Sequence, residues 1–168
     1  MTEKLPYLIS ILGMVGGILI AILFGINEDL FKDKIAQDLR SNSKIQGIED
    51  PVKQTDKLEA EKAKLWRYFQ RYHFHATGVG SMSLALLIFL SFVQGPKNLK
   101  LVSAYLTSIG GIFYPYVWFF AAMYGGIMGR SEAKEAFAIF GYCGGLFLLG
   151  TIGILLLGIK YPLSTVRE

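Results

Sequence analysis

The sequence predicts an all-α integral membrane protein, a single domain in which four transmembrane helices form an antiparallel bundle. Of its 168 residues, 52% are hydrophobic and only 18% are charged, less charge than soluble domains usually carry. Four apolar runs contain no Asp, Glu, Lys or Arg: residues 5–26, 74–93, 101–128 and 136–159. About 20 apolar residues cross the hydrocarbon core as a helix, and a helix satisfies its own backbone hydrogen bonds there.

The first run, residues 5–26, is longer than the apolar part of a typical signal peptide, and no A-x-A-like cleavage site follows it. We therefore expect a retained first span. Small residues recur in it at every fourth position: Gly13, Gly17, Ala21 and Gly25. The other runs contain similar pairs: Ala76 and Gly80, Thr77 and Ser81, Gly125 and Gly129, Gly141 and Gly145. Such faces let helices approach closely in a membrane, so they are expected to pack within the bundle or against another subunit.

The one long connection, residues 27–72, lies between the first two spans and is predicted to be helical. Phe31, Ile35 and Leu39 recur every four residues, which predicts a short amphipathic helix on the membrane surface or against the spans. The connection divides at the Asp50-Pro51 step.

A second helix is predicted to run from about Asp56 into the second span. Asp56 and Glu59 have the spacing of a capping box, and neither Pro nor Gly interrupts residues 55–77. Two acid–base pairs lie three residues apart on it: Glu59 with Lys62, and Glu61 with Lys64. This helix would extend well beyond the bilayer on the loop side.

The third run contains Pro115, which cannot donate a backbone hydrogen bond to Gly111 and predicts a kink in mid-membrane. Tyr114 and Tyr116 flank this proline and would be the most deeply placed hydroxyl groups. Two interpretations stay open for this segment, a kinked helix packed by aromatic rings and the wall of a ligand cavity. The fourth run contains the only cysteine, Cys143, which excludes an intramolecular disulfide.

The charge pattern bears on partners and on orientation. The net charge is +4, but no run of basic residues exists, so nucleic acid is not an expected partner. The total of Lys and Arg favours a cytoplasmic 27–72 loop. The flanks of the first span favour the opposite, because Lys4 precedes it and Glu28 and Asp29 follow it. We expect both termini on the cytoplasmic side of a bacterial inner membrane.

The segment WRYFQRYHFH, residues 66–75, is the most informative stretch for function. It contains both histidines of the protein, His73 and His75, together with Arg67 and Arg71, at the entrance of the second span. Two residues apart on a helix, the histidines point to opposite sides and cannot chelate one metal. His75 is the stronger candidate for the bundle interior, whereas His73 precedes the apolar run and is expected to reach water. An ordinary interfacial anchor of aromatic and basic residues is the competing interpretation.

A cofactor at this level would need further groups from the third span. We expect Met123, Tyr124 and Met128 to lie at the depth of His75, so that His75 and Met123 could hold a metal. Haem b accepts axial His or Met ligands, and copper also accepts Cys. A quinone would use a His or Tyr donor in an aromatic slot, and Arg67 and Arg71 could hold propionates or lipid phosphates.

The function predicted from these residues is a small membrane subunit that binds haem b or a quinone near His75 and transfers electrons. Alternatives are a non-catalytic accessory or assembly protein, and a small oligomeric channel or transporter using the Tyr114–Tyr116 kink. No carboxylate lies inside a span, and no HExxH, Walker A or GxSxG motif occurs. Besides the lipid bilayer, the expected partners are other copies of the chain or the subunits of a larger membrane complex.

Overall fold

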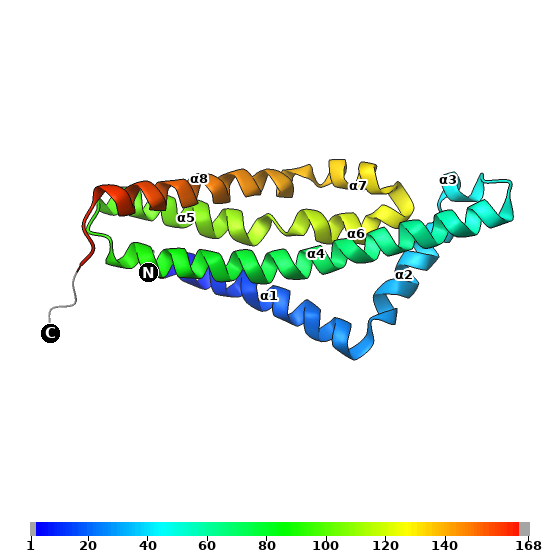
Figure 1. The fold of residues 1–168 in the computed structure, drawn as a ribbon, viewed down its shortest axis with the longest axis horizontal. Helices are drawn as coiled ribbons and strands as arrows, with labels where there is room; N and C mark the ends of the chain where they lie inside the picture. The colour runs from blue at the N-terminus through cyan, green and yellow to red at the C-terminus, as the bar shows by residue number, and fades with distance from the viewer. Residues whose placement is uncertain (1–2, 165–168) are drawn as a thin grey trace.

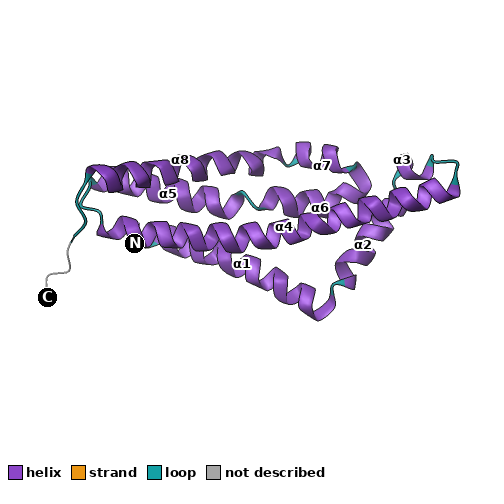
Figure 2. Ribbon diagram, in the orientation of Figure 1, coloured by secondary structure: helices purple, strands orange, loops and turns teal. Residues whose placement is uncertain are grey.

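A computed structural model describes residues 3–164, and these residues form helices with no β-strand among them. Eight helices follow one another along the chain (Figures 1 and 2): α1 Leu5–Asn27, α2 Asp29–Arg40, α3 Ser43–Gln46, α4 Pro51–Phe92, α5 Lys97–Phe113, α6 Tyr116–Met128, α7 Arg130–Ala136 and α8 Ala138–Lys160. Four stretches are long and apolar enough to cross a membrane: α1, α4, α5 with α6, and α8. These stretches match the four apolar runs predicted from the sequence.

The longest helix, α4, begins earlier than predicted. Its N-cap is Asp50, whose side chain accepts hydrogen bonds from the backbone N–H groups of Val52 and Lys53. Pro51 follows at the first helical position, where its fixed φ favours a helix and its missing N–H costs nothing. The prediction of a start near Asp56 is therefore wrong, because the Asp50-Pro51 step is the stronger initiation signal.

The length of α4 divides the molecule into two parts. Its 42 residues span about 63 Å, roughly twice the hydrocarbon thickness of a bilayer. Residues 51–72 therefore extend beyond the apolar half and are joined there by α2, α3, the end of α6 and α7 (Figure 1). We call this assembly the helical head. Its core consists of buried side chains from five helices: Ile35, Leu39, Ile45, Leu65, Tyr68, Phe69, Ala121, Ala122 and Ala133.

The amphipathic helix predicted from Phe31, Ile35 and Leu39 is confirmed as α2. Ile35 and Leu39 are buried, and α2 packs on α4 and α6. The predicted i,i+3 ion pairs are also present, with Lys64 Nζ 3.2 Å from Glu61 Oε1 and Lys62 Nζ 3.8 Å from Glu59 Oε1.

The predicted kink at Pro115 is confirmed as a break between two helices. α5 ends at Phe113 and α6 begins at Tyr116, and Pro115 between them is fully buried. The connection after α6 was expected to be a short loop, yet most of it forms α7. Gly129 separates α6 from α7 with φ of +98°, a conformation that glycine adopts without the strain a side chain would bring.

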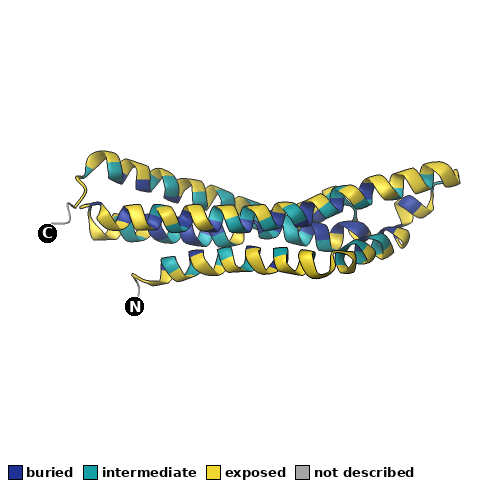
Figure 3. Ribbon diagram, turned by 60° about the horizontal axis from the view of Figure 1, so that its bottom comes forward, coloured by how far each residue is buried: buried dark blue, intermediate teal, exposed yellow. Residues whose placement is uncertain are grey.

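The end of the molecule opposite the head contains the first turn of α1, the ends of α4 and α8 and the start of α5 (Figure 1). We call it the terminal end. Two short extended segments join α4 and α8 there, since the Gln94 N–H donates to the Pro162 carbonyl and the Ser164 N–H donates to the Phe92 carbonyl. Buried residues concentrate between the helices, whereas the outer faces of α1 and α8 carry exposed leucine and isoleucine (Figure 3).

Some of the predicted small-residue contacts are present and others are absent. A Cβ added at Gly17 would lie 2.6 Å from the Thr77 backbone nitrogen, and one added at Gly80 would lie 2.8 Å from that of Met14. These two glycines hold α1 against α4. Gly25 and Gly145 were expected to pack in the same way, but a Cβ at either would meet nothing within 4 Å.

Candidate functional site

His75 lies on the face of α4 that is turned toward the α5–α6 break. Its ring is 5.4 Å from that of Tyr114 in an edge-on arrangement and 6.1 Å from that of Trp118, measured between ring centroids. The Tyr114 ring also lies against Gly144 of α8. The proline break therefore supplies a ring that lies between α4 and α8 at the level of His75.

The hydrogen bond of His75 decides which ring nitrogen is available. Nδ1 lies 2.8 Å from the Arg71 carbonyl oxygen. A carbonyl oxygen only accepts, so in the neutral ring Nδ1 carries the proton and Nε2 keeps its lone pair. Among the described residues, no protein group bonds to Nε2. A histidine that donates Nδ1–H to a backbone carbonyl and presents Nε2 has the arrangement typical of metal-ligating histidines.

The surroundings of His75 combine a cation, a buried donor and open space. The Arg71 guanidinium lies over the Trp118 ring at 4.9 Å and over the Tyr68 ring at 5.6 Å. The Trp118 Nε1–H is buried and has no hydrogen-bond partner among the described residues. One turn further along α4, Gly78 is exposed, and a Cβ there would meet nothing within 4 Å. The surface of α4 beyond His75 is therefore open.

His73 faces the other side of α4, as predicted for residues two apart. Its Nδ1 lies 2.9 Å from the Gly17 carbonyl oxygen of α1, and the Thr77 hydroxyl is 3.4 Å away. Its ring is half-buried, so it keeps exposed surface as expected, but it also lies in the contact between α1 and α4. Arg67, the other basic candidate, is exposed on the helical head.

The expected grouping of His75 with Met123, Tyr124 and Met128 is absent. Met123 packs on the core of the helical head, and its carbonyl accepts a hydrogen bond from Lys34. Tyr124 lies against Phe137, with ring centroids 5.3 Å apart, and Met128 is 41% exposed. No group of three His, Cys, Asp or Glu residues within 3–164 could hold a metal ion. The contacts of Met123 lie in the helical head and those of His75 at the α5–α6 break, so the structure does not bring the two together as a metal pair within one chain.

The error has a geometric cause in the register of α4 against α6. The side chain of Leu65 lies against Gly125, so the end of α6 lies level with the helical head and not with the entrance of the span. His75 is ten residues beyond Leu65, about 15 Å further along the helix. Tyr116, the remaining candidate, lies level with Tyr72, with ring centroids 5.4 Å apart.

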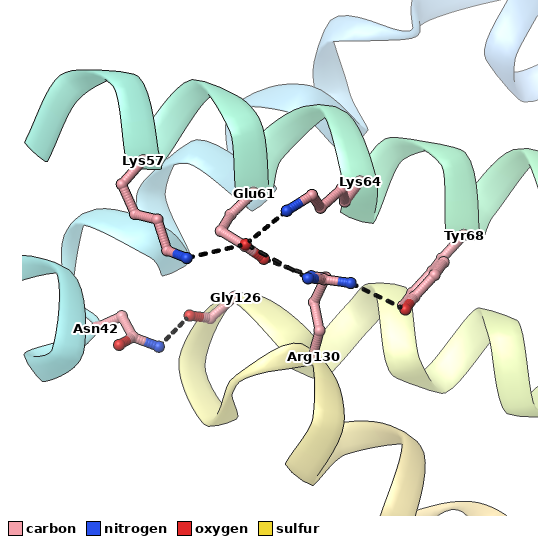
Figure 4. Close-up of polar contacts among 7 residues, drawn as sticks. All are labelled: Asn42, Lys57, Glu61, Lys64, Tyr68, Gly126 and Arg130. Atoms are coloured by element: carbon pink, nitrogen blue, oxygen red, sulfur yellow. Dashed lines mark hydrogen bonds and ion pairs between the residues drawn. The ribbon is translucent and has the colours of Figure 1, made fainter. Parts of the chain in front are cut away.

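A second polar cluster, in the helical head, was missed by sequence reasoning. Glu61 is buried and accepts hydrogen bonds from Arg130, whose Nη1 also reaches the Tyr68 hydroxyl at 3.5 Å (Figure 4). Lys57 and Lys64 complete the ion pairs of Glu61 at 3.5 and 3.2 Å. One signal was present in the sequence, because Glu61 falls on the apolar face of its helix. A carboxylate in such a position requires a buried partner.

Asn42 fixes the turn between α2 and α3 to the end of α6. Its Nδ2 donates to the Gly126 carbonyl at 2.9 Å (Figure 4). It also donates to the Ile127 carbonyl at 3.0 Å. The last carbonyls of a helix lack intrahelical partners, so this amide satisfies two of them. A cavity of about 260 Å³ lies beside Asn42 and Glu61, and their bonds tie its walls together. We assign this cluster to the stability of the helical head.

The charge state of Glu61 predicts an acid-sensitive helical head. Burial disfavours its carboxylate, but hydrogen bonds from Arg130 and Lys64 outweigh burial and hold the pKa of Glu61 below its ordinary value of 4.5. A lowered folded-state pKa contributes stability above the unfolded value, and that stability is lost as pH falls through the folded value. The melting temperature should therefore decrease as the pH is lowered below about 4.5.

Glu61→Gln should remove most of this acid dependence and cost about 2 kcal/mol at pH 7, the scale of hydrogen bonds to a charged group. Melting curves from pH 7 to pH 3 measure both effects. The matched control is Glu59→Gln, because Glu59 is exposed and pairs only with Lys62 at 3.8 Å. Identical pH profiles for Glu61→Gln and the parent protein would contradict the assignment.

Comparisons with known proteins give no relative from which a function could be transferred. No protein family model, no curated protein and no solved structure matches this chain. The assignment of function therefore depends on the residues described above.

Proposed function

We propose that the chain is an integral membrane protein of a bacterial inner membrane, with its long helices in an antiparallel bundle and both termini on the cytoplasmic side. Support comes from the four helical stretches that are long and apolar enough to cross a membrane. The exposed leucine and isoleucine on α1 and α8 also match a lipid environment. The orientation rests on the flanks of the first span, with Lys4 before it and Glu28 and Asp29 after it, against the larger number of Lys and Arg in the helical head.

Single-cysteine labelling tests this topology. In a Cys143→Ser background, cysteines at Ser43 in the helical head and at Asn98 at the terminal end are both exposed. A membrane-impermeant maleimide added to intact spheroplasts should label the first and spare the second until the membrane is opened. Labelling of both positions from one side would contradict the four-span topology.

Within that membrane, the function the geometry supports best is binding of haem b at His75 for electron transfer. The observation that carries it is the Nε2 of His75, which has no protein partner among the described residues while Nδ1–H donates to the Arg71 carbonyl. The exposed Gly78, one turn further along α4, leaves the helix surface open on that side. Arg71 is one helical turn from His75, toward the helical head, where a guanidinium could pair with a propionate. Haem would supply one-electron chemistry, and the protein would supply the ligand, the charge partner and the aromatic wall.

A second axial ligand would have to come from outside this chain. The methionines of α6 lie away from His75, and His73 faces α1. A second copy could bring its own His75 to the same group, and a different subunit could bring another ligand. We therefore propose that the functional form is a homo-oligomer or a larger membrane complex, in which another chain supplies the second ligand.

A quinone is the second candidate, and one observation favours it. Tyr114 and Trp118 both have ring contacts with His75, and neither the Tyr114 hydroxyl nor the Trp118 Nε1–H has a hydrogen-bond partner among the described residues. The Tyr114 hydroxyl would suit a quinone oxygen, and Nε2 would accept from a quinol hydroxyl. The Trp118 Nε1–H is buried and would reach a quinone only if its ring moved. The imidazole would then exchange a proton with the ring instead of binding iron.

Spectroscopy of the protein purified in mild detergent from its native membrane tests the proposal. Haem b at His75 predicts a Soret band and about stoichiometric iron, both absent from His75→Ala. A colourless protein that yields extractable quinone, again lost in His75→Ala, would support the second candidate. A protein with neither group would overturn both and leave the accessory or assembly role, or the channel or transporter role.

A further inference from the structure

A cleft at the terminal end combines apolar walls with a basic rim. It has a volume of about 440 Å³ and opens between α1, α4 and α5. Its walls are Pro6, Tyr7, Leu87, Leu90, Leu101 and Ala104. The volume lies within the range of pockets that hold small organic ligands, roughly 300–1,000 Å³. The cleft is far from His75 along α4, since Leu87 is twelve residues, about 18 Å, beyond it.

The shape of the cleft is held by specific bonds. The Tyr7 hydroxyl donates to the Leu87 carbonyl at 2.9 Å and so joins α1 to α4 deep in the wall. Lys100 Nζ donates to the Val93 carbonyl at 2.6 Å, near the end of α4. Lys97 Nζ pairs with Glu3 at 2.7 Å between the starts of α5 and α1.

The charge at the rim is unbalanced. Lys4, Lys97 and Lys100 line the cleft, and Glu3 is the only carboxylate among the described residues that line it. The Lys97 ammonium holds the pKa of Glu3 below its ordinary value, so Glu3 is ionised at neutral pH and offsets one lysine. Lys4 has no ion pair among the described residues. Two positive charges therefore remain for a ligand.

We infer that this cleft binds an anionic phospholipid, with its phosphate at the three lysines and an acyl chain against the leucine wall. The inference goes beyond electron transfer and depends on the proposed function only for the membrane location. Charge complementarity selects an acidic headgroup, because a zwitterionic lipid would bring a cation to an already positive rim. The position at the helix ends selects a lipid of the surrounding leaflet, since headgroups lie at that depth.

Lysines that only anchor the helix ends would place their ammonium groups in the headgroup layer without preferring one lipid in one cleft. Substitution of Glu3 distinguishes such an anchor from the inferred lipid site. Removal of a lysine from the cleft weakens binding of an acidic lipid, whereas removal of Glu3 strengthens it. An anchor that holds α1 to α5 through the Lys97–Glu3 pair would lose the same contact in both variants.

Native mass spectrometry of the full-length protein tests the site, with phosphatidylglycerol and phosphatidylcholine of identical acyl chains as probes. One phosphatidylglycerol should bind in preference to phosphatidylcholine. Lys4→Gln and Lys97→Gln should each weaken that binding about five-fold, the effect expected for one lysine near a charged surface. Glu3→Gln should strengthen it. The control is Lys53→Gln, a lysine of the helical head whose side chain is as exposed as that of Lys97 (79%).

Equal retention of the two lipids, or unchanged binding in both lysine variants, would overturn the inference. Weaker binding in Glu3→Gln would also overturn it, because that result belongs to a purely structural ion pair. The Soret band or quinone content of the same variants should stay at the parent level. Failure of the lipid site is thereby distinguished from failure of the His75 site.

Discussion

Gly17→Leu should lower the melting temperature of the detergent-solubilised protein by about 6–12 °C. The glycine lies where α1 crosses α4, and an added Cβ would be 2.6 Å from the Thr77 nitrogen and 3.0 Å from the Ala76 Cβ. Because the Thr77 nitrogen belongs to a helix backbone, only separation of the two helices relieves the overlap. Such overpacking costs about 3 kcal/mol, which corresponds to this shift in a protein of this size.

The same helix supplies the control. Gly25 is two turns beyond Gly17, and a Cβ there would meet nothing within 4 Å. Gly25→Leu should therefore leave the melting temperature within about 2 °C of the parent, since it makes no new contact. Equal melting temperatures for the two variants would mean that α1 does not pack on α4 as described. The test also separates glycines that pack helices from glycines that only follow the same spacing.

The second large effect concerns His75. His75→Ala should abolish the bound chromophore or quinone while the protein stays folded, because the ring is only partly buried and its hydrogen bond is local to α4. Absorbance per mole of protein measures occupancy, and a melting curve on the same sample measures folding. Met123→Leu should retain full occupancy, since Met123 packs in the helical head and not beside His75.

His73→Ala should lower the stability of the protein and leave the cofactor bound, the reverse of the result for His75→Ala. The Nδ1–H of His73 is the donor to the Gly17 carbonyl, so its loss should lower stability by about 1 kcal/mol and keep the cofactor. A His75→Ala protein with full cofactor occupancy would contradict the proposed site. The WRYFQRYHFH segment would then be explained by interfacial anchoring and by the contact between α1 and α4.

Much of the helical architecture was predictable because its signals are local. A run without charge, such as residues 136–159, indicates a helix whatever lies beside it, and α8 covers nearly the same residues. Pro115 breaks its helix because the missing N–H belongs to the proline itself. The opposite directions of His73 and His75 follow from the helical repeat, and the spacing of Ile35 and Leu39 similarly predicts the buried face of α2.

The candidate site was predicted in part. The choice of His75 and Arg71 followed from their position at the start of an apolar run. The contacts of His75 with Tyr114 and Trp118 depend on where α6 lies along α4, and no residue on either helix encodes that register alone. The expected grouping with Met123 and Met128 failed for this reason.

Local patterns in the sequence were enough to predict the four long apolar helices, the break at Pro115 and the apolar face of α2, because each arises from residues within a few turns of one another. They did not predict α7 or the start of α4 at Pro51. The tertiary structure alone decided which glycines pack and which distant charges meet. Gly150 lies against the Thr107 backbone, whereas Gly145 on the same helix meets nothing within 4 Å. Glu61 and Arg130 are 69 residues apart and meet because α2, α4 and α6 bury a common core. Helix register results from many weak contacts summed over both partners, so it exists only once the helices are packed.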